Sequence, residues 1–126
     1  MNTSAFGYNE AQLRFHEGSA LTHLGDTDRA WDAQQCALAL YPSSDFMDRT
    51  LTRLDRTLCL LRDGDSTGAL EVATDALAAL DDQQRQGIID LRGHEVLDAL
   101  PPRQQALASA RQLRELLTAT PEGDAP

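Results

Sequence analysis

The chain has 126 residues, which is enough for one domain with a modest core. Twenty acidic residues against eleven basic ones, all of them arginine, give a formal net charge of −9. This charge argues against binding nucleic acid through its phosphates and against docking on an anionic membrane. Leucine and alanine dominate, while valine and isoleucine together number four, so the composition predicts an all-α fold.

The two ends of the chain are expected to lie outside the folded part. Residues 1–10 contain neither the basic nor the apolar segment of a signal peptide, and we interpret them as an N-terminal extension. Residues 119–126 are rich in Pro, Gly and Ala, and we expect them to be disordered. One helical domain is predicted over residues 11–118. No apolar run reaches the roughly 18 residues of a membrane-spanning helix, so we expect a cytoplasmic protein with no membrane partner.

An internal repeat with a spacing of 39 residues is the strongest feature of the chain. Gly25-Asp26 opens a stretch that ends at Ala37-Leu38. Gly64-Asp65 opens a second stretch that ends at Ala76-Leu77. Glycine suits the left-handed position after a helix and aspartate suits the N-cap of the next one, so each pair predicts a tight turn between two helices. Apolar residues at helical spacing precede both turns: Leu13, Ala20, Leu21 and Leu24, then Leu51, Leu54, Leu58 and Leu61.

The rest of the chain is also predicted to be helical. A loop is expected over residues 41–49, which include Pro42. Residues 84–100 carry apolar side chains at helical spacing, and Pro101-Pro102 then interrupts the pattern. A last helix is expected from about Arg103, and we interpret these two helices as a third hairpin. The last helix has an apolar stripe at Ala106, Ala110, Leu113 and Leu117.

The repeated unit resembles the tetratricopeptide repeat (TPR), a helical hairpin of 34 residues. Where that family prefers small, apolar, Gly or Pro residues, the first unit has Gly18, Leu21, Gly25, Ala30, Ala37 and Pro42, and the second has Leu60, Gly64, Ala69 and Ala76. The resemblance implies a right-handed stack of about three helical hairpins, a TPR-like α-solenoid. The Gly-Asp turns and the arginine-containing stretch 110–117 are also similar to the helical-repeat region of actinobacterial XRE-type helix-turn-helix regulators. The DNA-binding domain of those regulators has no counterpart here, so direct binding of nucleic acid is not expected.

In the TPR family, ligands contact the first helix of each hairpin, which implies a largely apolar groove in this chain. The matching positions are Gln12, Phe15, Ser19, Thr22, His23, Leu51, Leu54, Leu58, Leu61 and Arg62. Alternatively, the leucines pack against the third hairpin and leave no groove. The resemblance implies a small interaction or regulatory module that binds a peptide, a partner protein or a second copy of itself. The alternatives are a small-molecule sensor or carrier and, less favoured, a pathway enzyme built on this fold.

Several other residues carry candidate chemistry, but each group also has a simple structural interpretation. Asp90, His94 and Asp98 share one helix face and could hold a metal or a general base, although a solvated face gives the same pattern. His16 and His23 are about 10.5 Å apart along a helix, too far to share a metal ion. Asp63-Gly64-Asp65 faintly resembles a calcium loop and is better explained as a turn and cap. We therefore predict no metal, no cofactor and no catalytic residue.

Three further side chains are expected to be structural. Cys36 and Cys59 fall among alanines and leucines on predicted helices, and we interpret both as small, reduced core residues. Trp31 is the repeat counterpart of Leu70. We expect it to be a buried anchor, and the alternative is an exposed interaction residue.

Overall fold

The computed structural model describes residues 9–118. No strand occurs within that range, so the all-α prediction is confirmed. The predicted disordered tail, and all of the predicted N-terminal extension except its last two residues, lie outside the described range. The elements are α1 (Glu10–Leu24), α2 (Thr27–Leu40), α3 (Phe46–Arg62), α4 (Ser66–Ala78), α5 (Ile88–Ala99), the short 3-10 helix η1 (Pro102–Ala106) and α6 (Ala108–Thr118).

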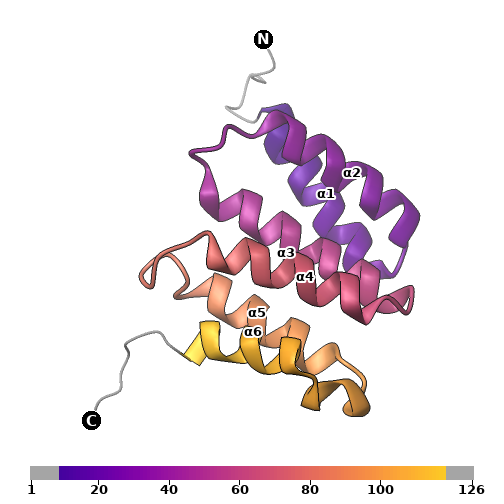
Figure 1. Ribbon diagram of the computed structural model, residues 1–126. Helices are drawn as coiled ribbons and strands as arrows, with labels where there is room; N and C mark the ends of the chain where they lie inside the picture. Colours follow the sequence, from indigo (N-terminus) through magenta and orange to yellow (C-terminus); the bar gives the residue numbers. More distant parts are fainter. Residues whose placement is uncertain (1–8, 119–126) are drawn as a thin grey trace.

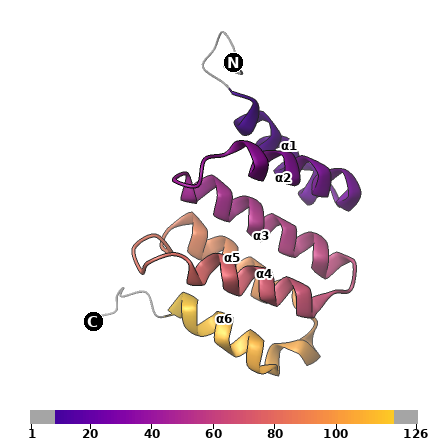
Figure 2. The same cartoon turned by 45° about the horizontal axis from the view of Figure 1, so that its top comes forward.

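The helices follow one another through the molecule in chain order, from α1 and α2 at one end to α6 at the other (Figures 1 and 2). α1 packs on α2 and α3 packs on α4, while α6 packs on both α4 and α5. α3 also contacts α1 on one side and α5 on the other. α3 is therefore the helix that joins the first pair of helices to the last pair.

Both Gly-Asp turns form as the repeat predicts. Gly25 and Gly64 have φ angles of +84° and +86°, the left-handed conformation that glycine adopts without steric cost. The side chains of Asp26 and Asp65 then cap α2 and α4, because each accepts a hydrogen bond from the backbone N–H three residues on, at 3.4 and 2.9 Å. The two turns end one helix and start the next.

The helix predicted over residues 84–100 starts later, at Ile88. A turn precedes it, in which the side chains of Asp81 and Gln84 bond reciprocally to each other's backbone N–H at 2.8 and 3.0 Å. Gly87 then adopts a φ of +69°, which is incompatible with a right-handed helix. The spacing of apolar residues carries no information about these backbone preferences, so it placed the start of the helix too early.

The last predicted helix is also shorter than expected. η1 follows Pro101 where a helix was expected near Arg103, and Leu107 is extended, with a ψ of 147°, before α6 begins. Ala106 therefore falls outside the α-helix and is exposed, whereas Ala110, Leu113 and Leu117 lie in the core as predicted.

Most of the buried apolar surface lies between α3, α4, α5 and α6. The largest cluster consists of Leu54, Leu70, Ala73, Leu77, Leu80, Ile89, Val96, Leu97, Leu100, Ala110, Leu113 and Leu117. The first pair of helices has two smaller clusters: Leu21, Ala30, Ala33 and Cys59, and Ala11, Ala37 and Tyr41. Within residues 9–118, no helix combines the length and apolar character that crossing a membrane requires.

Candidate functional site

The predicted groove leucines face the core. Leu54 is 1% exposed and belongs to the largest cluster, and Leu51, Leu58 and Leu61 are partly buried against it. That cluster includes residues of α4 and α5, both of which contact α3, so these leucines pack against the core. Thr22 is also 1% exposed. Leu54 and Thr22 therefore offer almost no surface to a ligand.

The other predicted groove residues contact neighbouring groups of the chain. Gln12 forms a capping box with Asn9 at the start of α1. The imidazole Nδ1 of His23 lies 2.8 Å from the carbonyl oxygen of Ser19. Phe15 packs edge-on against Tyr41, with ring centroids 6.4 Å apart, and the guanidinium of Arg62 donates to the carbonyl oxygen of Thr22.

A buried carboxylate lies where three helices meet. Asp55, in the middle of α3, has a side chain that is 4% exposed, and its Oδ1 is 3.4 Å from Nη1 of Arg92 on α5. Nε of Arg92 is 3.7 Å from Oε1 of Glu95. His23 of α1 also interacts electrostatically with Asp55. Side chains of α1 and α5 therefore act on the Asp55 carboxylate of α3.

Burial raises the pKa of the Asp55 carboxyl from 3.8 to about 6. The positive charges of Arg92 and His23 oppose this rise, and Glu95 adds to it. Desolvation dominates because a carboxylate removed from water loses more than a single contact at 3.4 Å restores. Asp55 can thus take up a proton under mildly acidic conditions, but its burial leaves no opening for a ligand.

His23 is a predicted site residue, whereas Asp55, Arg92 and Glu95 were not predicted from the sequence. The available signal was a carboxylate in the centre of a leucine-rich helix, directly after Leu54. Such a residue is rarely buried without a partner, so its position predicts a buried contact with a charged or polar group. The partner, Arg92, lies 37 residues further along the chain, and no local pattern connects the two.

Trp31 is less buried than its place in the repeat predicts. Its counterpart Leu70 is 1% exposed in the largest cluster, whereas Trp31 is only half-buried beside the small cluster that contains Leu21. Arg56 of α3 stacks on the indole, with Cζ 3.6 Å from the ring centroid, and its Nη1 donates to the Trp31 carbonyl oxygen at 3.3 Å. Both interpretations of Trp31 therefore apply in part, since it anchors α2 on α3 and remains partly exposed.

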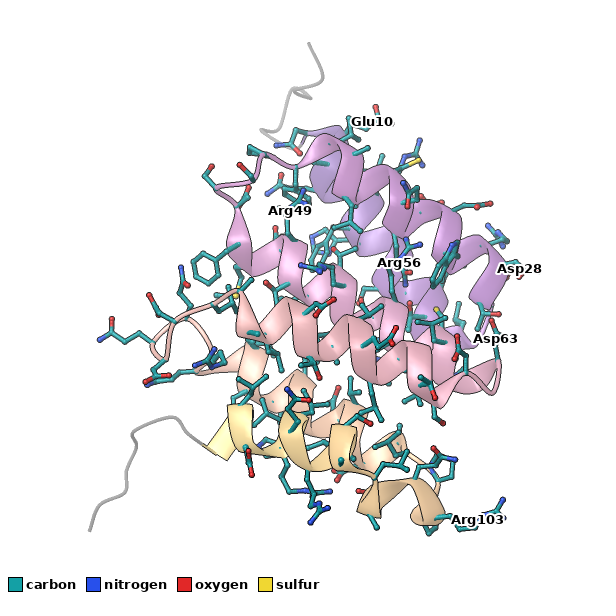
Figure 3. All side chains as sticks on the ribbon, viewed as in Figure 1. Glu10, Asp28, Arg49, Arg56, Asp63 and Arg103 are labelled. Atoms are coloured by element: carbon teal, nitrogen blue, oxygen red, sulfur yellow. The ribbon has the colours of Figure 1, made fainter. Side chains whose placement is uncertain are left out.

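A hollow of about 360 Å³ opens beside Trp31, between the first turns of α2 and the end of α3. We call it the Trp31 hollow, and it is lined by Thr27, Asp28, Trp31, Asp32, Leu60 and Asp63. Figure 3 shows Asp28 and Asp63 at the same end of the molecule, beside the α1–α2 and α3–α4 turns. Arg56, which stacks on the indole of Trp31, is not part of the lining.

The other candidate residues, the His94 group and the two cysteines, do not form a binding site in the part of the chain that the structure describes. Nε2 of His94 lies 3.4 Å from Oδ1 of Asp90, and Asp98 is exposed one turn further on. Within the part of the chain that the structure describes, no three His, Cys, Asp or Glu side chains are placed to hold one metal ion. Cys59 is buried as expected, whereas Cys36 is exposed, and both are free thiols. The expectation that Cys36 is a core residue is therefore wrong, because Cys36 lies at the surface, in a hollow that Arg14 and Glu17 of α1 also line.

Comparison of the chain with protein-family models, with curated proteins and with solved structures finds no match.

Proposed function

We propose that the chain is a small cytoplasmic protein-interaction module, built as a right-handed, TPR-like stack of three helical pairs. Two observations support this architecture. The Gly-Asp turns recur 39 residues apart, and α3 packs between α1 and α5, as the first helices of successive hairpins do in such a stack. The similarity to the repeat region of XRE-type regulators makes a regulatory partner the natural class.

The partial exposure of Trp31 is the observation that carries the functional proposal. A tryptophan at a core position of the repeat gains most by being fully buried, as Leu70 is. Trp31 instead borders an acidic hollow, and tryptophan is among the residues that contribute most to binding at protein interfaces. We infer that the partner covers this surface, rather than a groove along α1 and α3 whose leucines already pack in the core.

The proposal is tested by purifying the tagged protein from its own host and weighing the intact complex by native mass spectrometry. Three forms are compared: wild type, Trp31→Leu, and Leu91→Ala as the matched control. Trp31→Leu installs the residue found at the equivalent position of the second unit, so apolar packing is kept. Leu91 is 55% exposed on α5 and does not line the Trp31 hollow.

We expect wild type and Leu91→Ala to retain one polypeptide, either a partner or a second copy, at fixed stoichiometry, and Trp31→Leu to lose it. Recovery of a bare monomer from wild type would contradict the proposal. Equal recovery of the polypeptide with Trp31→Leu would also contradict it. Circular dichroism of all three forms checks that each remains folded.

A further inference from the structure

We propose that the ion pair between Asp55 of α3 and Arg92 of α5 is a proton-sensitive switch, in which uptake of a proton by Asp55 releases the Arg92 side chain to solvent. This inference is independent of the proposed function, because it concerns contacts within the chain and needs no partner. It is carried by the burial of Asp55, by the geometry of its contact with Arg92 and by the second carboxylate beside Arg92.

The Asp55 carboxylate is buried with little to replace its hydration. Its side chain is 4% exposed, and it follows Leu54, which belongs to the largest apolar cluster. Between residues 9 and 118, its one ion pair is with Nη1 of Arg92 at 3.4 Å, which is long for a charge-assisted hydrogen bond. Because so weak a contact does not offset desolvation, burial raises the pKa of Asp55 to about 6.

The charges that act on Asp55 come from the two helices on either side of α3. Arg92 of α5 and, to a smaller extent, His23 of α1 favour the ionised carboxylate, whereas Glu95 of α5 disfavours it. α2 and α4 also pack on α3, but within the described residues neither contributes a charged group that acts on Asp55. Since such coupling is reciprocal, an ionised Asp55 also holds Arg92, and a neutral Asp55 holds it less strongly.

Arg92 has a second carboxylate within reach, and that one lies closer to solvent. Its Nε is 3.7 Å from Oε1 of Glu95, whose side chain is 47% exposed. The Arg92 side chain is 25% exposed, so part of it already reaches water. Once Asp55 is neutral, Glu95 remains as the anionic partner, and exposed ion pairs hold an arginine only weakly. Protonation of Asp55 therefore frees the Arg92 guanidinium toward solvent.

The release of Arg92 leaves the packing of α5 in place. Ile89 and Val96 of α5 belong to the same apolar cluster as Leu54 of α3, and apolar contacts do not depend on protonation. Burying the ionised carboxylate also costs more than Arg92 restores, so protonation of Asp55 stabilises the fold as a whole. The switch thus operates without unfolding, and in mild acid it adds a free arginine to the surface of a chain whose net charge is −9.

The test follows both side chains by nuclear magnetic resonance in the full-length protein as the pH is lowered from neutral to mildly acidic. The chemical shift of the Asp55 carboxyl carbon reports its protonation, and that of the Arg92 Nε reports the surroundings of the guanidinium. We expect both signals to change with one midpoint, at a pH of about 6. Arg103, which is exposed in η1, is the internal control, and its Nε signal should not follow that midpoint.

Substitutions test the direction of the coupling. Arg92→Gln removes a positive charge and should move the Asp55 midpoint to higher pH, whereas Glu95→Gln removes a negative charge and should move it to lower pH. Glu71→Gln, which makes the same charge change at an exposed position of α4, is the matched control and should leave the midpoint unchanged. Asp55→Asn should abolish the pH dependence of the Arg92 signal. Circular dichroism checks that each variant is folded, and the other substitutions decide the question if Asp55→Asn is not.

An Arg92 signal that stays constant while Asp55 titrates would overturn the inference, because the two groups would then be uncoupled. An Asp55 midpoint at a pH of about 4, the value of a carboxyl in water, would overturn it as well. Equal shifts of the midpoint by Glu95→Gln and Glu71→Gln would also overturn it, since the effect would then reflect net charge alone. The partner surface at Trp31 is tested separately, by native mass spectrometry of Trp31→Leu.

Discussion

At the scale of single residues, the most informative side chain is the carboxylate of Asp55. A buried carboxylate is stable only where positive charges and hydrogen bonds replace the water it has lost. Asp55 has one contact at 3.4 Å with Arg92, which Glu95 also contacts. These contacts only partly replace the lost hydration of the carboxylate, and the pKa of Asp55 is raised for this reason.

Because the pKa of Asp55 is raised on folding, the free energy of unfolding depends on pH. The pKa of Asp55 is about 6 in the folded protein and close to 3.9 in an unfolded chain, so only the folded state binds the proton between these values. The stabilisation from this proton is fully present below about pH 4 and is lost as the pH rises through about 6. Asp55→Asn, which mimics the protonated form, should therefore raise the free energy of unfolding at about pH 7.5 by about 1–3 kcal/mol.

Near pH 4.5 the same substitution should have a smaller effect, about 1 kcal/mol, because wild-type Asp55 is then protonated in the folded state but still largely ionised in the unfolded chain. Urea denaturation at both pH values measures the difference. Asp75→Asn, an exposed substitution with the same change of charge, is the control. A destabilisation by Asp55→Asn of similar size at both pH values would mean that the Arg92 contact outweighs the desolvation.

A second buried polar group joins α1, α2 and α3. The hydroxyl of Thr22 donates to the carbonyl oxygen of Gly18 at 2.7 Å and accepts from Nε2 of Gln34 at 2.8 Å. Nε2 of Gln34 also lies 3.7 Å from Sγ of Cys59, which is a weak acceptor. Both Thr22 and Gln34 are 1% exposed, so neither can replace its partner with water.

Removing one member of this network should cost more than removing two. Thr22→Val leaves the Gln34 amide with only a sulfur acceptor, and we expect a loss of about 1–3 kcal/mol in the free energy of unfolding. Adding Gln34→Met should recover much of that loss, because no buried donor is then left without an acceptor. Urea denaturation of the two single variants and the double variant measures the coupling. Strictly additive losses would show that the two side chains are energetically independent.

At the scale of the elements, the turns were the most predictable part of the chain. A Gly-Asp pair specifies a left-handed residue and an N-cap through local backbone chemistry, so α1, α2, α3 and α4 end and begin close to where the repeat places them. The start of α5 and the break before α6 were not predicted, because apolar spacing says nothing about Gly87 or the extended Leu107. A boundary was predicted well only where a specific residue encodes it.

Gly64 allows the backbone contribution of one such turn to be measured by itself. A Cβ placed on Gly64 would meet no atom within 4 Å, so a substitution there introduces strain in φ without a clash. We expect Gly64→Ala to lower the free energy of unfolding by about 1–2 kcal/mol. Gly64→Asn should lose less, because asparagine tolerates the left-handed conformation better. Thermal denaturation of both variants tests this, and an alanine variant as stable as wild type would contradict it.

At the scale of the whole molecule, the sequence indicated the helical class and the repeat. It did not indicate which helices pack together to form the core. The apolar stripe of α3 was visible, yet it did not reveal whether Leu51, Leu54 and Leu58 line a groove or pack with α5 and α6. That choice depends on contacts between distant segments, as does the pairing of Asp55 with Arg92. The Trp31 hollow could not be predicted for the same reason, because it is formed by residues of both α2 and α3. The repeat alone places Trp31 in the core.

The uneven core predicts uneven stability along the chain. The largest apolar cluster stabilises α3 to α6, whereas α1 and α2 are held by small clusters of mostly alanine and by polar contacts such as that of Arg56 with Trp31. Burial of large side chains contributes more free energy than burial of alanine. The first pair of helices should therefore open without global unfolding, and its amides should exchange with solvent faster than those of α4 and α5.

Hydrogen exchange followed by mass spectrometry measures this difference segment by segment. Leu113→Ala, which removes a fully buried side chain of the largest cluster, should speed exchange in α4 and α5 far more than it speeds exchange in α1. Uniform protection along the chain would instead mean that the molecule unfolds as one unit.

If α1 and α2 open without global unfolding, a partner bound at the Trp31 hollow would stabilise the least stable part of the protein. Binding there should then slow exchange in α2 more than in α5.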